Sequence, residues 1–146
     1  MRWNTIARTT YLVAGLALVP MACGPAEPAA SGPVFDVTIK DFKVRPSSPT
    51  VPAGTVTLSV SNVGPTTHEF VVVRTDLPDG ELPIGADGLS VDEDRLDDVD
   101  EIEGVEDGST EQVTVRLKPG RYVFFCNFEG HYLAGMHAPV RVVGDA

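Results

Sequence analysis

The sequence predicts an all-β protein, folded as an antiparallel Greek-key β-sandwich with one short helix in an acidic loop. Several segments alternate apolar and polar residues with a period of two, as strands with one buried face do. Clusters of proline, glycine, serine and asparagine separate these segments. A series of short strands joined by such turns is typical of a sandwich in a domain of about 110 residues.

The alternation places the individual strands. Apolar and polar side chains alternate in three stretches: 35–40, 55–61 and 112–117. Residues 70–73 are continuously apolar, which suits a central strand covered on both faces. Further strands are expected over 121–126 and 140–143, where valine and aromatic residues dominate.

An acidic stretch interrupts this pattern. Eleven of residues 87–107 are acidic and one, Arg95, is basic. Ser90 and Glu93 have the spacing of a capping box, so we expect a short helix over about 91–98. Such a run of charge is most often a solvated face, and the alternative is a docking surface for a cationic redox partner.

Length and charge limit the possible functions. A chain of 146 residues is long enough for one domain with a substantial core, and we expect a monomer. The 21 acidic residues outnumber the 11 lysines and arginines, which leaves a formal net charge of −10. Because phosphate binding needs a basic surface, this composition argues against a nucleic-acid partner and against an anionic membrane surface.

The N-terminal region has the features of an export signal. Arg2 and Arg8 precede a nine-residue apolar run over 11–19, which is too short to span a bilayer. We therefore expect residues 1–22 to be a signal peptide and the mature protein to be extracytoplasmic, in the cell envelope.

Two processing routes remain open for this region. Ala22 followed by Cys23 resembles the lipobox of bacterial lipoproteins, in which the cysteine is lipidated and anchors the protein to a membrane. Ordinary cleavage near Ala29 is the alternative, giving a periplasmic or secreted protein. In the first case residues 23–33, which are rich in proline and glycine, form a tether, and residues 34–146 form the folded domain.

Three chemically distinct side chains lie within eleven residues at the end of a predicted strand. Cys126, His131 and Met136 supply a thiol, an imidazole and a thioether, and removal of residues 1–22 would leave Met136 as the sole methionine. Soft sulfur ligands together with imidazole select copper, and two histidines, one thiolate and a weak axial methionine define a blue copper centre. His68 is the candidate for the second histidine, because it opens a strand directly after a glycine-containing turn.

Other interpretations of these residues are weaker but remain open. His137 could replace His131 as a ligand, although its position beside Met136 favours a surface role. Zinc could occupy a site with one cysteine and two histidines, but a structural zinc site uses a fourth strong ligand instead of methionine. A sandwich without metal is the remaining alternative.

These motifs resemble those of the cupredoxins, over essentially the whole predicted domain. The Cys-x4-His-x4-Met spacing is similar to that of rusticyanin and auracyanin members of the family. The segment 62–70 resembles the turn that holds their first histidine ligand, and 122–126 resembles the strand that leads into their copper loop. The resemblance implies a cupredoxin-like β-sandwich with one type 1 copper site that cycles between Cu(I) and Cu(II).

Two residues depart from the family pattern. Glu69 stands where many cupredoxins have asparagine after the first histidine, and Glu129 stands where azurin-like loops often have proline. If these carboxylates lie close to the metal and are ionised, they favour Cu(II) and lower the reduction potential.

The function that follows is the transfer of single electrons between redox partner proteins, such as a cytochrome or an oxidase. Copper scavenging or delivery by an envelope lipoprotein would use the same ligands and is the alternative function. We do not expect an enzyme, because copper oxidases and nitrite reductases need further copper sites that the three histidines of the chain cannot supply.

Overall fold

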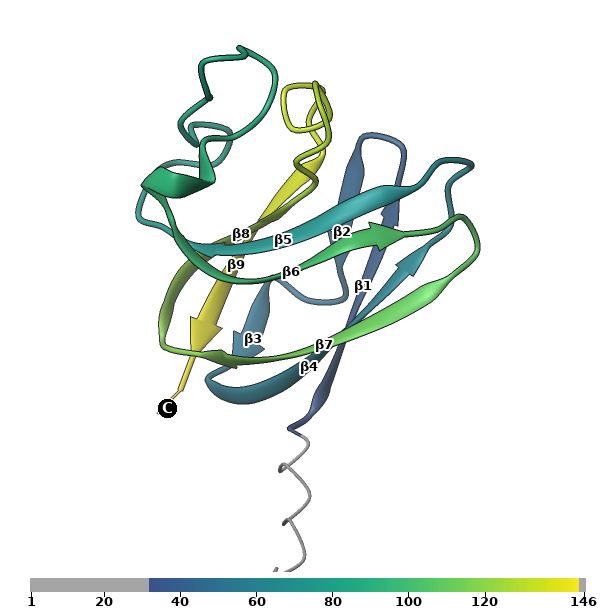
Figure 1. Cartoon of the computed structure of the whole chain (residues 1–146). Helices are drawn as coiled ribbons and strands as arrows, with labels where there is room; N and C mark the ends of the chain where they lie inside the picture. Colours follow the sequence, from purple (N-terminus) through teal and green to yellow (C-terminus); the bar gives the residue numbers. More distant parts are fainter. Residues whose placement is uncertain (1–31, 145–146) are drawn as a thin grey trace, which may run out of the picture.

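Nine β-strands form most of the structure over residues 32–144, which are the residues that the computed structural model describes (Figure 1). The elements are β1 (Val34–Lys40), β2 (Lys43–Pro46), β3 (Thr50–Pro52), β4 (Gly54–Asn62), β5 (His68–Arg74), η1 (Glu93–Arg95), β6 (Asp97–Val105), β7 (Thr110–Leu117), β8 (Gly120–Phe125) and β9 (His137–Val143). The expected signal peptide and nearly all of the expected tether lie outside the described residues. Within residues 32–144, no helix is long and apolar enough to cross a membrane.

The strands form two sheets that pack face to face. One sheet has the order β2-β1-β4-β7, and the other has the order β3-β9-β8-β5-β6. The predicted all-β sandwich is therefore confirmed. The sheets are mixed, since β1 pairs with β4 and β3 pairs with β9 in parallel, while the other pairings are antiparallel.

The predicted helix over about 91–98 is reduced to a single 3-10 turn, Glu93–Arg95. From Asp97 onward the chain is extended and pairs antiparallel with β5 as strand β6. The ladder hydrogen bonds to β5 outweigh the local helical signal, and the residue that caps the short turn is Asp92, which makes no side-chain cap. Strand β6 lies at the sheet edge, where acidic side chains hinder pairing with another chain.

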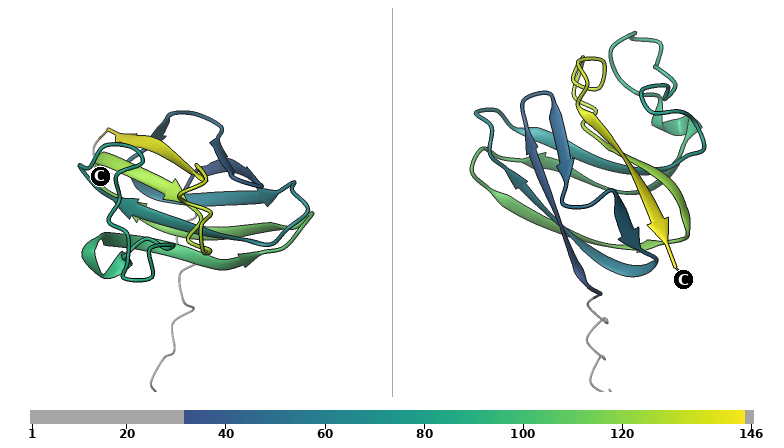
Figure 2. Two further views of the ribbon diagram at one scale, coloured as in Figure 1. Left: turned by 90° about the horizontal axis from the view of Figure 1, so that it is seen from above. Right: turned by 180° about the vertical axis from the view of Figure 1, so that it is seen from behind.

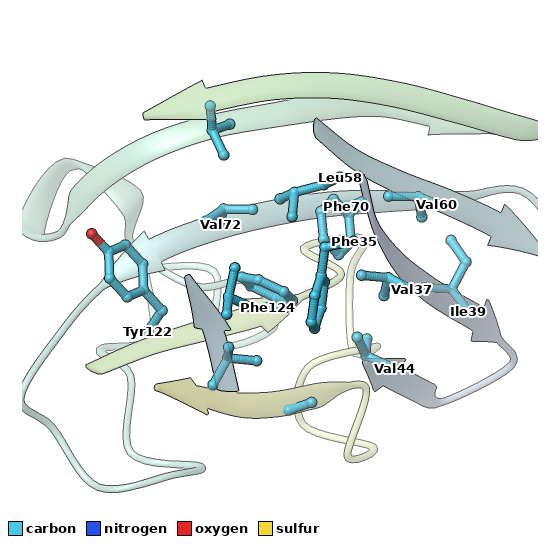
Figure 3. Packing of buried hydrophobic residues seen from close by; sticks show 14 of the residues in the cluster. Phe35, Val37, Ile39, Val44, Leu58, Val60, Phe70, Val72, Tyr122 and Phe124 are labelled. Carbon is cyan, nitrogen blue, oxygen red and sulfur yellow. The ribbon is translucent and has the colours of Figure 1, made fainter. Parts of the chain in front are cut away.

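The main core lies between the two sheets (Figure 3). The alternation in β1 and β4 points one set of side chains inward: Phe35, Val37, Ile39, Val56, Leu58 and Val60, all at most 8% exposed. Phe70 and Phe124 face them from the other sheet, and their rings meet edge to face with centroids 5.4 Å apart. Burial of such side chains contributes about 1.5–3 kcal/mol each, so this layer supplies much of the driving force for folding.

A second, smaller core covers the outer face of the five-stranded sheet. Val71 and Val73 on β5 and Val123 and Phe125 on β8 point away from the main core and are buried. The long segment 75–96 crosses this face and covers it with two further buried side chains, those of Leu82 and Val91. The continuous apolar run over 70–73 is thus explained as predicted, by a strand covered on both faces.

The two ends of the sandwich have different roles. The loop 126–136, the turn between β1 and β2 and the segment 75–96 lie together at one end (Figures 1 and 2). The start of β1 and the end of β9 lie at the opposite end. The candidate site is therefore at the end that faces away from residue 34.

Candidate metal centre

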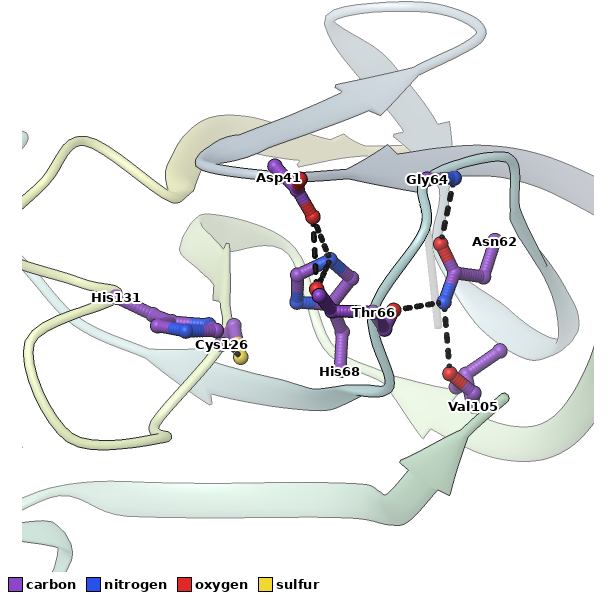
Figure 4. A network of polar contacts seen from close by, with 8 residues as sticks. All are labelled: Asp41, Asn62, Gly64, Thr66, His68, Val105, Cys126 and His131. Atoms are coloured by element: carbon purple, nitrogen blue, oxygen red, sulfur yellow. Dashed lines mark hydrogen bonds and ion pairs between the residues drawn. The ribbon is translucent and has the colours of Figure 1, made fainter. Parts of the chain in front are cut away.

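Three of the four predicted ligands come together at this end. One ligand atom from each of His68, Cys126 and His131 lies within 4.8 Å of the others. The Cys126 Sγ and His131 Nδ1 atoms are 3.4 Å apart, and the two imidazole centroids are 5.3 Å apart (Figure 4). His68 and Cys126 are fully buried, whereas His131 is partly exposed.

The sheet explains why residues 58 positions apart meet. His68 is the first residue of β5, and Cys126 directly follows β8. These strands are antiparallel neighbours, with Val71 paired to Phe125, so the beginning of β5 lies beside the end of β8. His68 and Cys126 are thus both held at the ends of central strands, where the backbone is tied into the sheet.

The fourth predicted ligand lies at the base of the loop. The Cys126 amide donates to the Met136 carbonyl at 3.1 Å, and the Met136 amide donates to the His131 carbonyl at 3.0 Å. The Met136 side chain is fully buried and belongs to the same core cluster as Cys126. The loop that carries three predicted ligands is thus closed on itself by backbone hydrogen bonds.

The turn before His68 is fixed by the buried side chain of Asn62. Its Nδ2 donates to the Thr66 carbonyl at 2.7 Å and to the Val105 carbonyl at 2.9 Å, and its Oδ1 accepts from the Gly64 amide at 3.0 Å (Figure 4). Two of these hydrogen bonds lie within the turn and the third ties it to the end of β6, so the turn presents His68 in one orientation.

His68 has the hydrogen bonding expected of a metal ligand. Its Nε2 lies 3.2 Å from Oδ1 of Asp41, whereas its buried Nδ1 has no hydrogen-bond partner among the described residues. An unpartnered buried polar atom is costly, and a metal ion would satisfy it. Burial, followed by repulsion from His131, lowers the pKa of His68, which favours the neutral imidazole that a metal requires.

The chemistry of the donors fits copper. Burial is the largest influence on Cys126 and raises the pKa of its thiol, so the side chain is protonated without a cation beside it. A thiol, two imidazoles and a neighbouring buried methionine form the donor set of a type 1 copper site.

His137, the spare histidine of the sequence, is not a member of this group. Its Nδ1 lies 2.8 Å from Oδ1 of Asp79, and its ring lies against that of Tyr132 with centroids 4.8 Å apart. These contacts give His137 a role at the surface, and the geometry favours His131 over His137 as the ligand.

The two acidic departures differ in their relation to the ligand cluster. Glu129 is exposed, whereas Glu69 follows His68 on β5 and is one of the groups that act, after burial, on the pKa of the Cys126 thiol. Burial, followed by repulsion from Glu93 and Glu101, raises the pKa of Glu69 to about 7. Its carboxylate therefore belongs to the acidic group on the outer face of the sheet.

Two residues in the turn between β1 and β2 were not identified from the sequence. Asp41 contacts His68, and the ring of Phe42 meets that of His131 edge-on with centroids 5.4 Å apart. Phe42 has a φ of 55°, in the left-handed region that residues other than glycine seldom adopt. A two-residue turn has no local pattern that indicates a metal site, so only the tertiary contacts show this role.

A sequence model described as a cupredoxin-like domain matches residues 12–136, which is most of the chain. The chain belongs to the cupredoxin-like family. Cupredoxins are copper proteins that typically transfer electrons. No curated protein sequence matches this cupredoxin.

Solved structures share its fold. Sodium-dithionite-reduced auracyanin from the photosynthetic bacterium Roseiflexus castenholzii is 24% identical over 80% of this chain and 100% of its own, with a TM-score of 0.58. Auracyanin A, a "blue" copper protein from Chloroflexus aurantiacus, is 20% identical over 77% and 100% of the two chains, with a TM-score of 0.55. An azurin, Az-iso2 from Methylomonas sp. strain J, is 17% identical over 76% and 98%, with a TM-score of 0.53. At these identities the likeness shows the fold alone.

Proposed function

We propose that this cupredoxin is an extracytoplasmic carrier of single electrons, with one type 1 copper held by His68, Cys126, His131 and Met136. The observation that carries the proposal is the buried, unpartnered Nδ1 of His68 close to the thiol of Cys126 and the imidazole of His131. When bound, copper would supply one-electron exchange between Cu(I) and Cu(II).

The protein would contribute a rigid, dry setting for this exchange. His68 and Cys126 are fully buried at the ends of paired strands, and the loop between Cys126 and Met136 is closed by backbone hydrogen bonds. A site held in this way has little freedom to rearrange when the charge of its metal changes, and low reorganisation favours fast electron transfer.

His131 is the natural contact point for a redox partner, because it alone among the three clustered ligands reaches the surface. Exposed apolar side chains lie beside it in sequence or in space. Phe42 and Phe128 contact its ring, and Leu133 is 54% exposed two residues further along the loop. We infer an apolar contact surface for a partner such as a cytochrome or an oxidase.

The arrangement of the two ends is consistent with attachment through the N-terminal region. Residue 34 lies at the opposite end of the sandwich from the candidate site (Figure 1). An anchor at Cys23 would therefore attach the protein at the end opposite to the candidate site, which would leave His131 accessible to a redox partner. Lipidation itself is part of the proposal and is tested by mass spectrometry of the mature N-terminus.

The visible spectrum of the oxidised, copper-loaded protein tests the site. We expect a strong thiolate-to-copper charge-transfer band, and we expect Cys126→Ser to abolish it. Cys23→Ser is the matched control, since it removes the other cysteine and should retain the band. A Cys126→Ser variant that keeps the colour would overturn the ligand assignment.

Repeated redox cycling in the presence of a copper chelator separates electron transfer from copper delivery. A carrier should retain stoichiometric copper through many cycles, because its function depends on a resident metal. Loss of the copper within one or two cycles would instead support the copper-handling function.

A further inference from the structure

The turn between β1 and β2 brings the carboxylate of Asp41 next to His68, a predicted copper ligand, on the side of the ring that carries Nε2. Oδ1 of Asp41 lies 3.2 Å from Nε2 of His68 and accepts a hydrogen bond from Oγ1 of Thr66 at 2.7 Å (Figure 4). Thr66 Oγ1 is itself 3.3 Å from the same imidazole nitrogen. Asp41, Thr66 and His68 thus form a closed polar triangle beside the candidate metal centre.

These three contacts decide which of the two ring nitrogens of His68 carries the hydrogen. An ionised carboxylate can only accept hydrogen bonds, so Nε2 of His68 must carry the hydrogen that it donates to Asp41. The neutral imidazole then has its lone pair on Nδ1, the nitrogen that has no hydrogen-bond partner among the described residues. One carboxylate therefore sets which nitrogen of His68 is available to a metal.

The fold holds Asp41 in place from two sides. Strands β1 and β2 pair directly up to Lys40 and Lys43, which leaves Asp41 and Phe42 as the turn. Gly64, in the turn that leads to His68, packs so closely against this hairpin that an added Cβ would lie 3.0 Å from Cα of Lys40 and 3.1 Å from the amide nitrogen of Asp41. Glycine at position 64 allows the two turns to approach, and Asp41 then reaches His68.

We propose that Asp41 is a positioning residue that holds His68 with Nδ1 toward the metal and lowers the reduction potential of the site. The inference rests on the proposed function. A carboxylate hydrogen-bonded to a ligating histidine fixes the ring and makes it a stronger donor. Its negative charge also favours Cu(II) over Cu(I) by Coulomb attraction, and the partial exposure of Asp41 keeps this effect moderate.

Voltammetry of the full-length, copper-loaded protein tests the effect on potential. Asp41→Asn keeps a carbonyl acceptor and removes the charge. We expect the Cu(II)/Cu(I) equilibrium to shift about tenfold toward Cu(I), which raises the potential by about 59 mV for a one-electron couple.

The chain offers a matched control in its second His–Asp pair. Asp79 lies 2.8 Å from Nδ1 of His137, and the side chains of Asp79 and Asp41 are similarly exposed, at 43% and 39%. Asp79→Asn removes the same charge from a histidine outside the ligand cluster, so we expect an unchanged potential. Equal shifts in the two variants, or no shift in Asp41→Asn, would overturn the proposed tuning.

Nitrogen NMR of the copper-free protein tests the positioning role without reference to copper. We expect His68 to be in the Nε2–H form in the wild type and in Asp41→Asn, and to become a mixture of tautomers in Asp41→Ala. An unchanged single tautomer in Asp41→Ala would overturn the positioning role. Because this readout uses metal-free protein, it still decides the inference if the copper-binding proposal itself fails.

Discussion

The phenol oxygen of Tyr132 accepts a hydrogen bond from the backbone amide of Leu82 at 3.0 Å, across 50 residues of sequence. Tyr132 belongs to the ligand loop, and Leu82 belongs to the segment 75–96 that covers the outer face of the sheet. Further contacts join these parts. Asn127 Oδ1 accepts from the Val91 amide at 2.6 Å, its Nδ2 donates to the Val91 carbonyl at 3.2 Å, and the Gly130 amide donates to the Leu89 carbonyl at 3.0 Å. The long segment therefore braces the loop that carries three predicted ligands.

Replacing Tyr132 by phenylalanine should loosen this brace. The buried Leu82 amide would lose its acceptor, which should lower the free energy of unfolding by about 1–3 kcal/mol. We expect faster hydrogen exchange over 80–91 in the metal-free protein, measured by mass spectrometry. Tyr122→Phe is the control, because the Tyr122 hydroxyl bonds only to the backbone of Lys118 among the described residues. If both variants speed exchange over 80–91 equally, the brace is not specific.

His68→Gly should open a coordination position that added imidazole can fill. The prediction follows from the unpartnered Nδ1 of His68 within the ligand cluster. We expect the charge-transfer band to be weakened in this variant and restored by imidazole, as followed by visible spectroscopy. His137→Gly should keep the wild-type band, since His137 pairs with Asp79 instead. The opposite pattern would show that the two histidines have been misassigned.

Copper should stabilise the folded protein strongly. The ligand atoms are assembled by strands β5 and β8, so the unfolded chain has much less affinity for the metal. Free copper at about 1,000 times its dissociation constant would add roughly 4 kcal/mol to the free energy of unfolding. Calorimetry of the metal-free and copper-loaded forms measures the difference. The Cys126→Ser variant should gain much less, and equal melting of both wild-type forms would contradict a specific site.

Substitutions of Met136 should move the reduction potential in opposite directions. Met136→Gln should lower it, because an amide oxygen is a harder donor than a thioether and favours Cu(II). Met136→Leu should raise it, because the weak axial donor is lost and the site becomes less polar. Voltammetry of the wild type and both variants measures the shifts. Shifts of the same sign, or no shift, would mean that Met136 serves packing and not axial ligation.

Much of the fold was determined by local sequence pattern. The alternation in 35–40 predicts a strand with one buried face, and the continuous apolar run over 70–73 predicts a strand buried on both, as the structure confirms. The alternating stretch 55–61 also forms a strand, but its polar Thr57 and Ser59 are buried as well as its apolar residues. These predictions succeed because burial of one face imposes a period of two on any strand. The helix expected near 91–98 was wrong in extent, because pairing of β6 with β5 is a long-range interaction that a capping motif does not report.

The sequence by itself determined the donor set of the candidate site, since Cys126, His131 and Met136 follow one another at fixed spacing in one loop. Only the tertiary structure decided how His68 joins them and what surrounds it. The meeting of His68 with Cys126 depends on the antiparallel pairing of β5 and β8, and the contact of Asp41 with His68 depends on the close packing of two separate turns. Ligand chemistry is a property of residue types and can be found in a sequence. The orientation and charge around a ligand come from contacts between distant segments, which form only when the sheets pack.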